Sequence, residues 1–210
     1  MTKVQLEVRG RVAVATIDNP PVNALGVAVR EGLAAAIRQA NADASVVAIV
    51  IAAAGKAFIA GADISEFGKP PAPPSLPEVL DAIEGSTKPV VAAIQGVALG
   101  GGLEVALACH ARVALPAAKL GLPEIKLGII PGAGGTQRLP RLIGAAKAFP
   151  MMLSGEPISA GKALEYGLLD EVVSSDVVAA ASRLAEALAA EGRRPVSSEA
   201  TGALTEADRE

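Results

Sequence analysis

The chain has 210 residues, of which 51% are hydrophobic and 20% charged, so it can bury a substantial core within one domain and is too apolar to be disordered. The formal net charge of -3 argues against nucleic acid or an anionic membrane surface as the main partner. Because no apolar run reaches ~18 residues without glycine, proline or charge, we expect no membrane span.

The single cysteine, Cys109, lies in an apolar segment that has the composition of a helix. One cysteine allows neither an internal disulfide framework nor a cysteine metal cluster, and this usage suits a reducing compartment. No signal-peptide pattern precedes the first strand-like run. We therefore expect a cytoplasmic protein without a metal site.

The first 51 residues alternate strand patterns with a helix pattern. Two runs, 4–9 and 12–17, flank Gly10 and Arg11 and predict a β-hairpin. Apolar residues at helical spacing predict a helix over 27–41, and the fully apolar run 46–51 predicts a parallel strand covered on both faces. This alternation is typical of an α/β domain.

A proline-rich segment follows, with five prolines between Gly68 and Pro77. Such a composition predicts an extended or mobile loop, which would act either as a lid over a pocket or as a passive connection. The residues 77–84 after it predict a short helix with proline in its first turn.

The second half of the chain continues the same alternation. The patterns predict strands over 89–94 and 111–115, and helices over 144–153, 159–166 and 176–191. Pro150 lies inside the first of these helices, where proline removes a backbone hydrogen bond at a cost of about 3 kcal/mol. We expect one domain over 1–192 and a polar, disordered tail over 193–210.

The stretch from Val97 to Glu124 carries the pattern most typical of a reactive site. Three glycines, 100–102, end an apolar strand and open a helix whose first turn contains Glu104. The first N–H groups of a helix lack internal partners and lie at the positive end of its dipole, so an oxygen anion could bind to the bare backbone there. With Glu124, two carboxylates could flank one reacting centre. Alternatively, the glycines form only a tight turn and both glutamates are solvated.

Four motifs in this order resemble the enoyl-CoA hydratase/isomerase (crotonase) family. They are 57–64 (AFIAGADI), 100–104 (GGGLE), 122–125 (LPEI) and 131–139 (PGAGGTQRL). The resemblance covers roughly residues 4–173 and is greatest to the hydratase part of multifunctional fatty-acid oxidation enzymes. It implies a crotonase-like fold of repeated β-β-α units, with the family's C-terminal helical region truncated. It also implies a homo-oligomer, namely a trimer or a multiple of one.

The resemblance implies hydration of 2-trans-enoyl-CoA to 3-hydroxyacyl-CoA in fatty-acid β-oxidation. By the same resemblance, the N–H groups of Ala62 and Gly101 would form an oxyanion hole, while Glu104 would orient and deprotonate water. Glu124 would deliver a proton to carbon, and the Gly132 N–H would help to hold the water. Alternatives are an isomerase that shifts a 3-enoyl double bond to position 2, and a truncated module that binds acyl-CoA or a protein partner without turnover. Relatives that only shift the double bond commonly retain just the second glutamate.

The substrate's coenzyme A moiety would, by resemblance, be held largely by backbone, with a cation near its phosphates. The implied contact residues are Pro21, Val22, Ala60, Gly61, Asp63 and Ile64, with Lys56 as the candidate cation. Lys56 could equally be an ordinary surface lysine, and Asp63 could simply cap a strand-to-helix turn at Ala62. Coenzyme A arrives as part of the substrate, so we expect no separate cofactor.

Two other chemistries find no support in the sequence. The only histidine, His110, follows an apolar segment and is read as structural, and there is no G-x-S-x-G for a serine hydrolase. Nicotinamide binding is not predicted, because Gln137 stands where the last glycine of G-x-G-x-x-G is needed.

Overall fold

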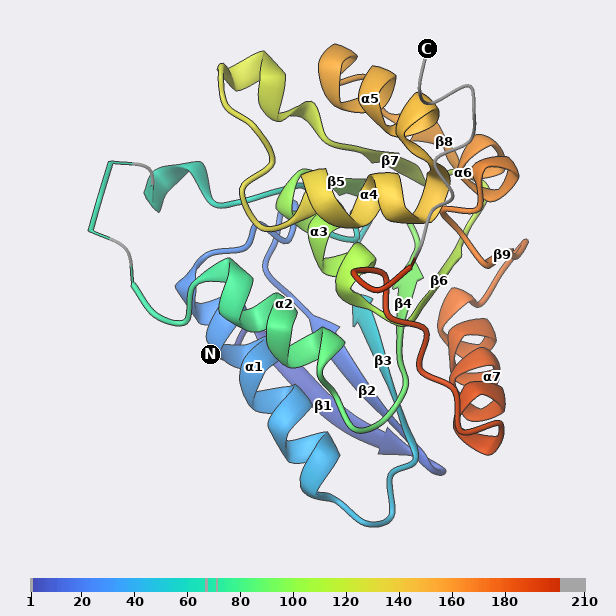
Figure 1. The fold of residues 1–210 in the computed structure, drawn as a ribbon. Helices are drawn as coiled ribbons and strands as arrows, with labels where there is room; N and C mark the ends of the chain where they lie inside the picture. Colours follow the sequence, from blue (N-terminus) through green and yellow to red (C-terminus); the bar gives the residue numbers. More distant parts are fainter. Residues whose placement is uncertain (1, 67, 71, 201–210) are drawn as a thin grey trace.

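The computed structural model describes residues 2–66, 68–70 and 72–200 and shows two β-sheets surrounded by helices (Figure 1). In the six-stranded sheet, β1 pairs antiparallel with β2 and the other neighbours are parallel. Its order is β1 (Val4–Arg9), β2 (Val12–Ile17), β3 (Ala48–Ala53), β4 (Val90–Ile94), β6 (Ala111–Ala114) and β9 (Glu171–Val172). The three-stranded sheet contains β5 (Val97–Leu99), β7 (Lys119–Gly121) and β8 (Ile158–Ser159).

The large sheet is buried on both faces, as the apolar strand patterns predict. In β3, Ile49 and Ile51 belong to the larger core cluster, whereas Ala48 and Val50 belong to the smaller one on the opposite face. Side chains of successive strand residues point to opposite faces of the sheet. A strand that is apolar throughout is therefore buried only if helices cover both faces of the sheet. The helices α1 (Val27–Ala42), α2 (Leu76–Glu84) and α3 (Gly101–Ala108) cover one face, and α7 (Val177–Ala190) covers the other (Figure 1).

Most of the predicted elements are present, with shifts at their ends. β3 begins two residues later than predicted, and α2 begins at Leu76 behind a capping box formed by Ser75 and Glu78. The sequence patterns missed the three-stranded sheet, whose strands are two or three residues long, and helix α4 (Gly135–Ile143). The helix α5 (Ala145–Ser154) continues through Pro150, which is exposed. Ser159 and Gly167 cap α6 (Ala160–Tyr166) as predicted.

The described part of the proline-rich loop is tied to α1 by the side chain of Arg30. This guanidinium donates hydrogen bonds to the carbonyl oxygens of Ala72 and Pro74, and pairs with Glu66 in the one-turn helix η1 (Ile64–Glu66) at 2.8 Å. Arg30 is itself buried. The loop, predicted as extended or mobile, is therefore anchored at 72–74 by hydrogen bonds from a buried arginine to its carbonyl oxygens.

The C-terminal segment 193–200 also differs from the expectation of a disordered tail. Ser197 is buried, Arg194 donates a hydrogen bond to the Ser86 carbonyl oxygen, and the Ser198 N–H donates to a carboxylate oxygen of Glu84 at 3.2 Å. The segment has little apolar area, and polar contacts to the end of α2 hold it instead. The remainder of the predicted tail, 201–210, lies outside the described residues.

A glycine allows α3 to lie directly on the segment that precedes η1. A Cβ atom built at Gly102 would overlap the carbonyl oxygen of Ile59 and come within 2.8 Å of its carbonyl carbon. The segment of Ile59 is in turn bonded to β5, since the Leu99 N–H donates to the Ile59 oxygen at 3.0 Å. The start of α3 and the residues 59–62 are thereby fixed side by side.

We expect Gly102→Ala to lower the free energy of unfolding by about 1–3 kcal/mol, because an added methyl group would have to displace rigid backbone rather than a flexible side chain. Urea denaturation followed by circular dichroism measures this change. Gly161→Ala is the matched control: it lies in α6 with nothing within 4 Å of the added methyl, so it should not destabilise the protein. Equal stability of the Gly102 variant and wild type would contradict the close approach.

Candidate active site

Most of the site residues predicted from the sequence, including both glutamates, line a cavity of about 310 Å³. Its walls come from the segment before η1, from the starts of α2 and α3, from η2 (Pro123–Leu127) and from the loop before α4. The lining residues are Ala60, Gly61, Ala62, Ile64, Leu76, Pro77, Gly100, Gly101, Glu104, Pro123, Glu124, Leu127, Ile129, Ile130, Gly132 and Ala133. η2 and the loop before α4 are continuous, so the cavity joins four stretches of the chain, 60–64, 76–77, 100–104 and 123–133.

Ala62 and Gly101 are neighbours on the cavity wall. A Cβ atom built at Gly101 would lie 3.8 Å from the Ala62 nitrogen, and Gly101 is the first residue of α3. The N–H groups in the first turn of a helix have no internal acceptor and lie at the positive end of the helix dipole. The arrangement can therefore bring backbone donors to an oxygen that gains negative charge in the cavity.

The carboxyl group of Glu104 is almost fully buried and is held by two backbone N–H donors. It is 3% exposed, and its Oε1 accepts hydrogen bonds from the N–H groups of Ala133 and Gly135, each at 2.8 Å. Burial raises the pKa of Glu104, while these two N–H groups and the charge of Arg138 oppose the increase. With Oε1 held in this way, Oε2 is the oxygen available to a ligand in the cavity.

Glu124 approaches the same cavity from η2. Gly100 has φ +53°, a conformation that L side chains rarely adopt, and a Cβ there would come within 3.0 Å of the Glu124 Oε1. Among the described residues, Glu124 Oε2 is buried and has no hydrogen-bond partner. Burial raises the pKa of Glu124, and the nearby charge of Glu104 raises it further. Such surroundings favour a carboxyl group that keeps its proton.

The other sequence-predicted residues divide into three groups: those that line this cavity, one in an adjacent hollow, and three outside both. Ala60, Gly61, Ile64 and Gly132 line the cavity with the two glutamates, whereas Asp63 lines an adjacent hollow beside Arg30 and Glu66. Pro21, Val22 and Lys56 are exposed and lie outside both linings, although the Val22 carbonyl oxygen accepts a hydrogen bond from the Ala60 N–H at 3.1 Å. The structure thus places both glutamates, Ala62 and Gly101 on one cavity and leaves Lys56 outside it.

His110 serves the fold, as its sequence context indicates. It is 1% exposed, its Nδ1 accepts a hydrogen bond from the Val90 N–H at 2.8 Å, and its Nε2 lies 3.2 Å from the Glu84 carbonyl oxygen. Burial lowers the pKa of His110, which fits a neutral ring with Nε2 as the donor.

Sequence reasoning missed the N–H groups of Ala133 and Gly135 that hold Glu104. Gly134 and Gly135 stand at the start of a helical stretch, and this pattern could have indicated free N–H groups there. The patterns gave no indication that this helix start would face the side chain of a residue 31 positions earlier.

Within 2–66, 68–70 and 72–200, no helix is both long and apolar enough to cross a membrane. The same ranges contain no cluster of three or more histidine, cysteine, aspartate or glutamate side chains suited to a metal ion.

Comparisons with known proteins agree with the fold. The chain is 50% identical over 198 residues to a zebrafish (Danio rerio) protein named peroxisomal bifunctional enzyme, covering 94% of this chain and 27% of that protein. It is 51% identical over 176 residues to a probable enoyl-CoA hydratase of Bacillus subtilis, covering 80% of this chain and 68% of the relative. The crystal structure of enoyl-CoA hydratase from Bacillus anthracis superposes with a TM-score of 0.82 at 37% identity, covering 89% of this chain and 76% of that one.

The chain thus spans about a quarter of the length of the bifunctional relative. The family described as enoyl-CoA hydratase/isomerase matches residues 7–207. A match over nearly the whole chain, with the fold of solved hydratases, means that this chain belongs to the enoyl-CoA hydratase/isomerase family.

Proposed function

We propose that the chain hydrates 2-trans-enoyl-CoA to 3-hydroxyacyl-CoA, a reaction of fatty-acid β-oxidation. The observation that carries this proposal is the placement of Glu104 and Glu124, both buried, on one cavity whose wall also includes Ala62 and Gly101. Adding water to an enoyl thioester requires a base for the water, an acid for the carbon next to the thioester and donors for the enolate oxygen.

Each part of the cavity takes one of these tasks. The N–H groups of Ala62 and Gly101 donate to the thioester oxygen as the enolate forms. Glu104, through Oε2, accepts a proton from water as the water oxygen bonds to C3, and the Gly132 N–H helps to hold that water. Glu124 then gives its proton to C2, and exchange of protons with water restores both carboxyl groups.

The coenzyme A portion of the substrate would run along the backbone near Pro21, Val22 and Ala60, with Asp63 beside it. Lys56 is the candidate cation for its phosphates. Apolar side chains of Ile64, Leu127 and Ile130 supply a wall for the acyl chain. No separate cofactor is needed, because neither step transfers electrons.

The second candidate function is isomerisation of 3-enoyl-CoA to 2-enoyl-CoA, favoured by the buried, unpartnered Oε2 of Glu124 within the described residues. One carboxyl group can move a proton between C2 and C4 without a bound water.

Loss of the 2-enoyl thioester absorbance of crotonyl-CoA, measured with the purified chain, tests the proposal. A hydratase consumes the substrate and forms the 3-hydroxyacyl thioester. Conversion of 3-enoyl-CoA without hydration would show an isomerase instead, and binding of crotonyl-CoA without turnover would show a binding module.

For the compartment, we propose the cytoplasm, supported by the free thiol of buried Cys109. The zebrafish relative is named as peroxisomal, so the peroxisome is the alternative. Cell fractionation distinguishes the two.

We also propose a homo-oligomer, a trimer or a multiple of one. Large apolar side chains are exposed on η2, on the loop after it and on α5, which packs against η2: Ile125, Leu127, Ile129, Ile130, Phe149 and Leu153. Contiguous apolar surface on a water-exposed face normally marks a contact site.

Light scattering of the purified chain should accordingly give the mass of a trimer or a multiple at micromolar concentration. Replacing Phe149 and Leu153, which are 56% and 71% exposed, by glutamate should reduce the mass, because a charge in an apolar contact is costly to desolvate. Val8→Glu, on β1 and 45% exposed, is the control that should leave the mass unchanged. A stable wild-type monomer would overturn the proposal.

A further inference from the structure

The loop that holds Glu104 depends on one buried arginine. Arg138, on α4, is 7% exposed, and its Nη1 donates a hydrogen bond to the Ala133 carbonyl oxygen at 3.1 Å. The same guanidinium lies so close to Gly134 that a Cβ atom there would overlap it. Arg138 therefore sets the path of the backbone from Ala133 to Gly135, whose N–H groups bind Glu104 Oε1.

Arg138 is in turn held by Glu84 at the last turn of α2. Its Nη2 lies 2.8 Å from Oε2 of Glu84 and its Nε lies 3.1 Å from Oε1, the two-pronged geometry that fixes a guanidinium in one plane. The side chains are 9% and 13% exposed, so solvent screens this pair little. Burial would raise the pKa of Glu84, but the hydrogen bonds and charge of Arg138 keep it below its ordinary value.

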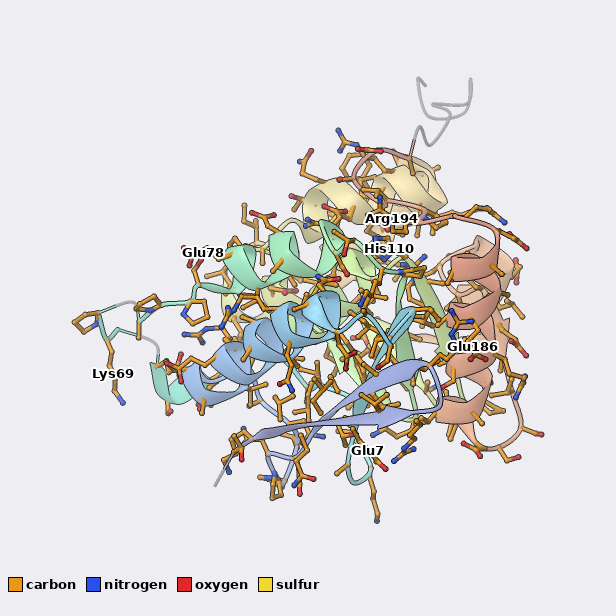
Figure 2. All side chains as sticks on the ribbon, turned by 90° about the horizontal axis from the view of Figure 1, so that it is seen from below. Glu7, Lys69, Glu78, His110, Glu186 and Arg194 are labelled. Carbon is orange, nitrogen blue, oxygen red and sulfur yellow. The ribbon has the colours of Figure 1, made fainter. Side chains whose placement is uncertain are left out.

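Glu84 also receives the C-terminal segment. The Ser198 N–H donates to Glu84 Oε1 at 3.2 Å, and Arg194 bonds to the Ser86 carbonyl oxygen just beyond the end of α2. Figure 2 shows Arg194 beside His110, whose Nε2 contacts the Glu84 carbonyl oxygen, at the end of α2 opposite Glu78. The segment 193–200 is therefore bonded to the residue that holds Arg138.

We propose that Arg138 is a positioning residue for Glu104, and that the Arg138–Glu84 pair couples the seating of the C-terminal segment 193–200 to the geometry and charge of the acid–base site. The contacts run without a gap from the Ser198 N–H through Glu84, Arg138 and Ala133 to Glu104. The kinetic part of this inference rests on the proposed hydratase function, whereas the effect on Glu104 itself does not.

The charges around Glu104 determine the direction in which its pKa should change when Arg138 is replaced. The charge of Glu104 opposes the ionisation of Glu124 on η2, whereas Arg138 on α4 favours the ionisation of Glu104. Glu84 and Asp81 on α2 face Arg138 rather than Glu104, at 2.8 and 3.9 Å from its Nη2. Removing the positive charge of Arg138 should therefore raise the pKa of Glu104 further.

The decisive measurement is a carbon-13 NMR titration of the Glu104 carboxyl group in the unliganded protein. In Arg138→Gln the titration should move to higher pH, and in Arg138→Lys, which restores the charge, it should return toward wild type. Because Glu104 must be ionised to act as the base, the acid limb of kcat/KM for hydration should move to higher pH in parallel. We expect kcat for Arg138→Gln to fall by ~10- to 100-fold, with KM changing much less, since a small misplacement of a catalytic group has effects of this size.

Arg112→Gln is the matched control. Arg112 is also buried, and it donates to the carbonyl oxygens of Ala106 and Cys109 at the other end of α3. Its loss should destabilise the fold but leave the Glu104 titration unchanged. If Arg138→Gln is folded and its Glu104 titrates as in wild type, Arg138 serves the fold alone and the proposal is overturned.

Ser198 tests the contribution of the C-terminal segment. Proline at 198 has no N–H to donate to Glu84, whereas alanine keeps it. Ser198→Pro should move the Glu104 titration in the same direction as Arg138→Gln, by less, and Ser198→Ala should match wild type. A wild-type titration in Ser198→Pro would overturn the coupling to the segment. A wild-type chain that fails to hydrate crotonyl-CoA would instead refute the proposed function, and the NMR titrations would still decide the role of Arg138.

Discussion

Replacing Glu124 by glutamine should lower the rate of crotonyl-CoA hydration by ~10²–10⁴-fold, the usual contribution of a general acid. Glutamine has nearly the same shape as glutamate but cannot give a proton to C2. The burial of Glu124 and the nearby charge of Glu104 raise its pKa, which suits the role of acid that we propose for this carboxyl group. Steady-state kinetics at saturating substrate measure the effect, and the loss should lie in kcat rather than in KM.

Glu156→Gln is the control for this substitution. Glu156 is exposed and pairs with Lys126, which is close to Glu124 in η2. Neutralising Glu156 changes the charge near the cavity but leaves the Glu124 carboxyl group intact, so hydration should continue at nearly the wild-type rate. A Glu124→Gln variant as active as wild type would remove Glu124 from the mechanism.

Replacing Glu104 by glutamine should reduce hydration by a similar ~10²–10⁴-fold, since the variant lacks the carboxylate that we propose as the base for the water. The glutamine oxygen can still accept the N–H groups of Ala133 and Gly135, so we expect the fold to be kept. Comparing thermal unfolding with kcat in the same preparation separates a chemical defect from a folding defect.

The two glutamate variants should differ in a second reaction. Moving a double bond from position 3 to position 2 requires no water, so Glu104→Gln should retain more of any isomerase activity than Glu124→Gln. Glu186→Gln, an exposed change on α7 on the far face of the large sheet, is the control for both reactions (Figure 2). Equal loss of isomerisation in both glutamate variants would contradict this division of roles.

The sequence predicted those parts of the fold that depend on local pattern. The apolar run around Ile49 required cover on two faces, and the caps Ser159, Gly167 and Asp176 marked helix ends through interactions within a few residues. The three-stranded sheet escaped prediction because two- or three-residue strands have no measurable period, and their pairing depends on distant segments.

Within the candidate site, the pattern identified the glutamates and glycines, but not what holds them. Position 102 must be glycine because a side chain there would overlap the Ile59 carbonyl oxygen. Arg138 is held by an ion pair with Glu84, 54 positions earlier in the chain. The tail was predicted as disordered because the apolar area of 193–200 is small, whereas its contacts are made by backbone N–H groups and an arginine whose partners cannot be read from the sequence.

The cavity is built entirely from segments outside the six-stranded sheet, from 60–64, 76–77, 100–104 and 123–133. Proteins open locally in cooperative units, and regions with fewer buried contacts open at lower free energy than core strands. The strands β2, β3 and β4 lie between helices on both faces, so their amides should exchange with solvent slowly. The loop around Ala133 is held mainly by hydrogen bonds to the side chains of Glu104 and Arg138, so we expect it to open and reclose more often than the sheet unfolds. The proposed acid–base site would then be lost and regained while most of the native structure remains.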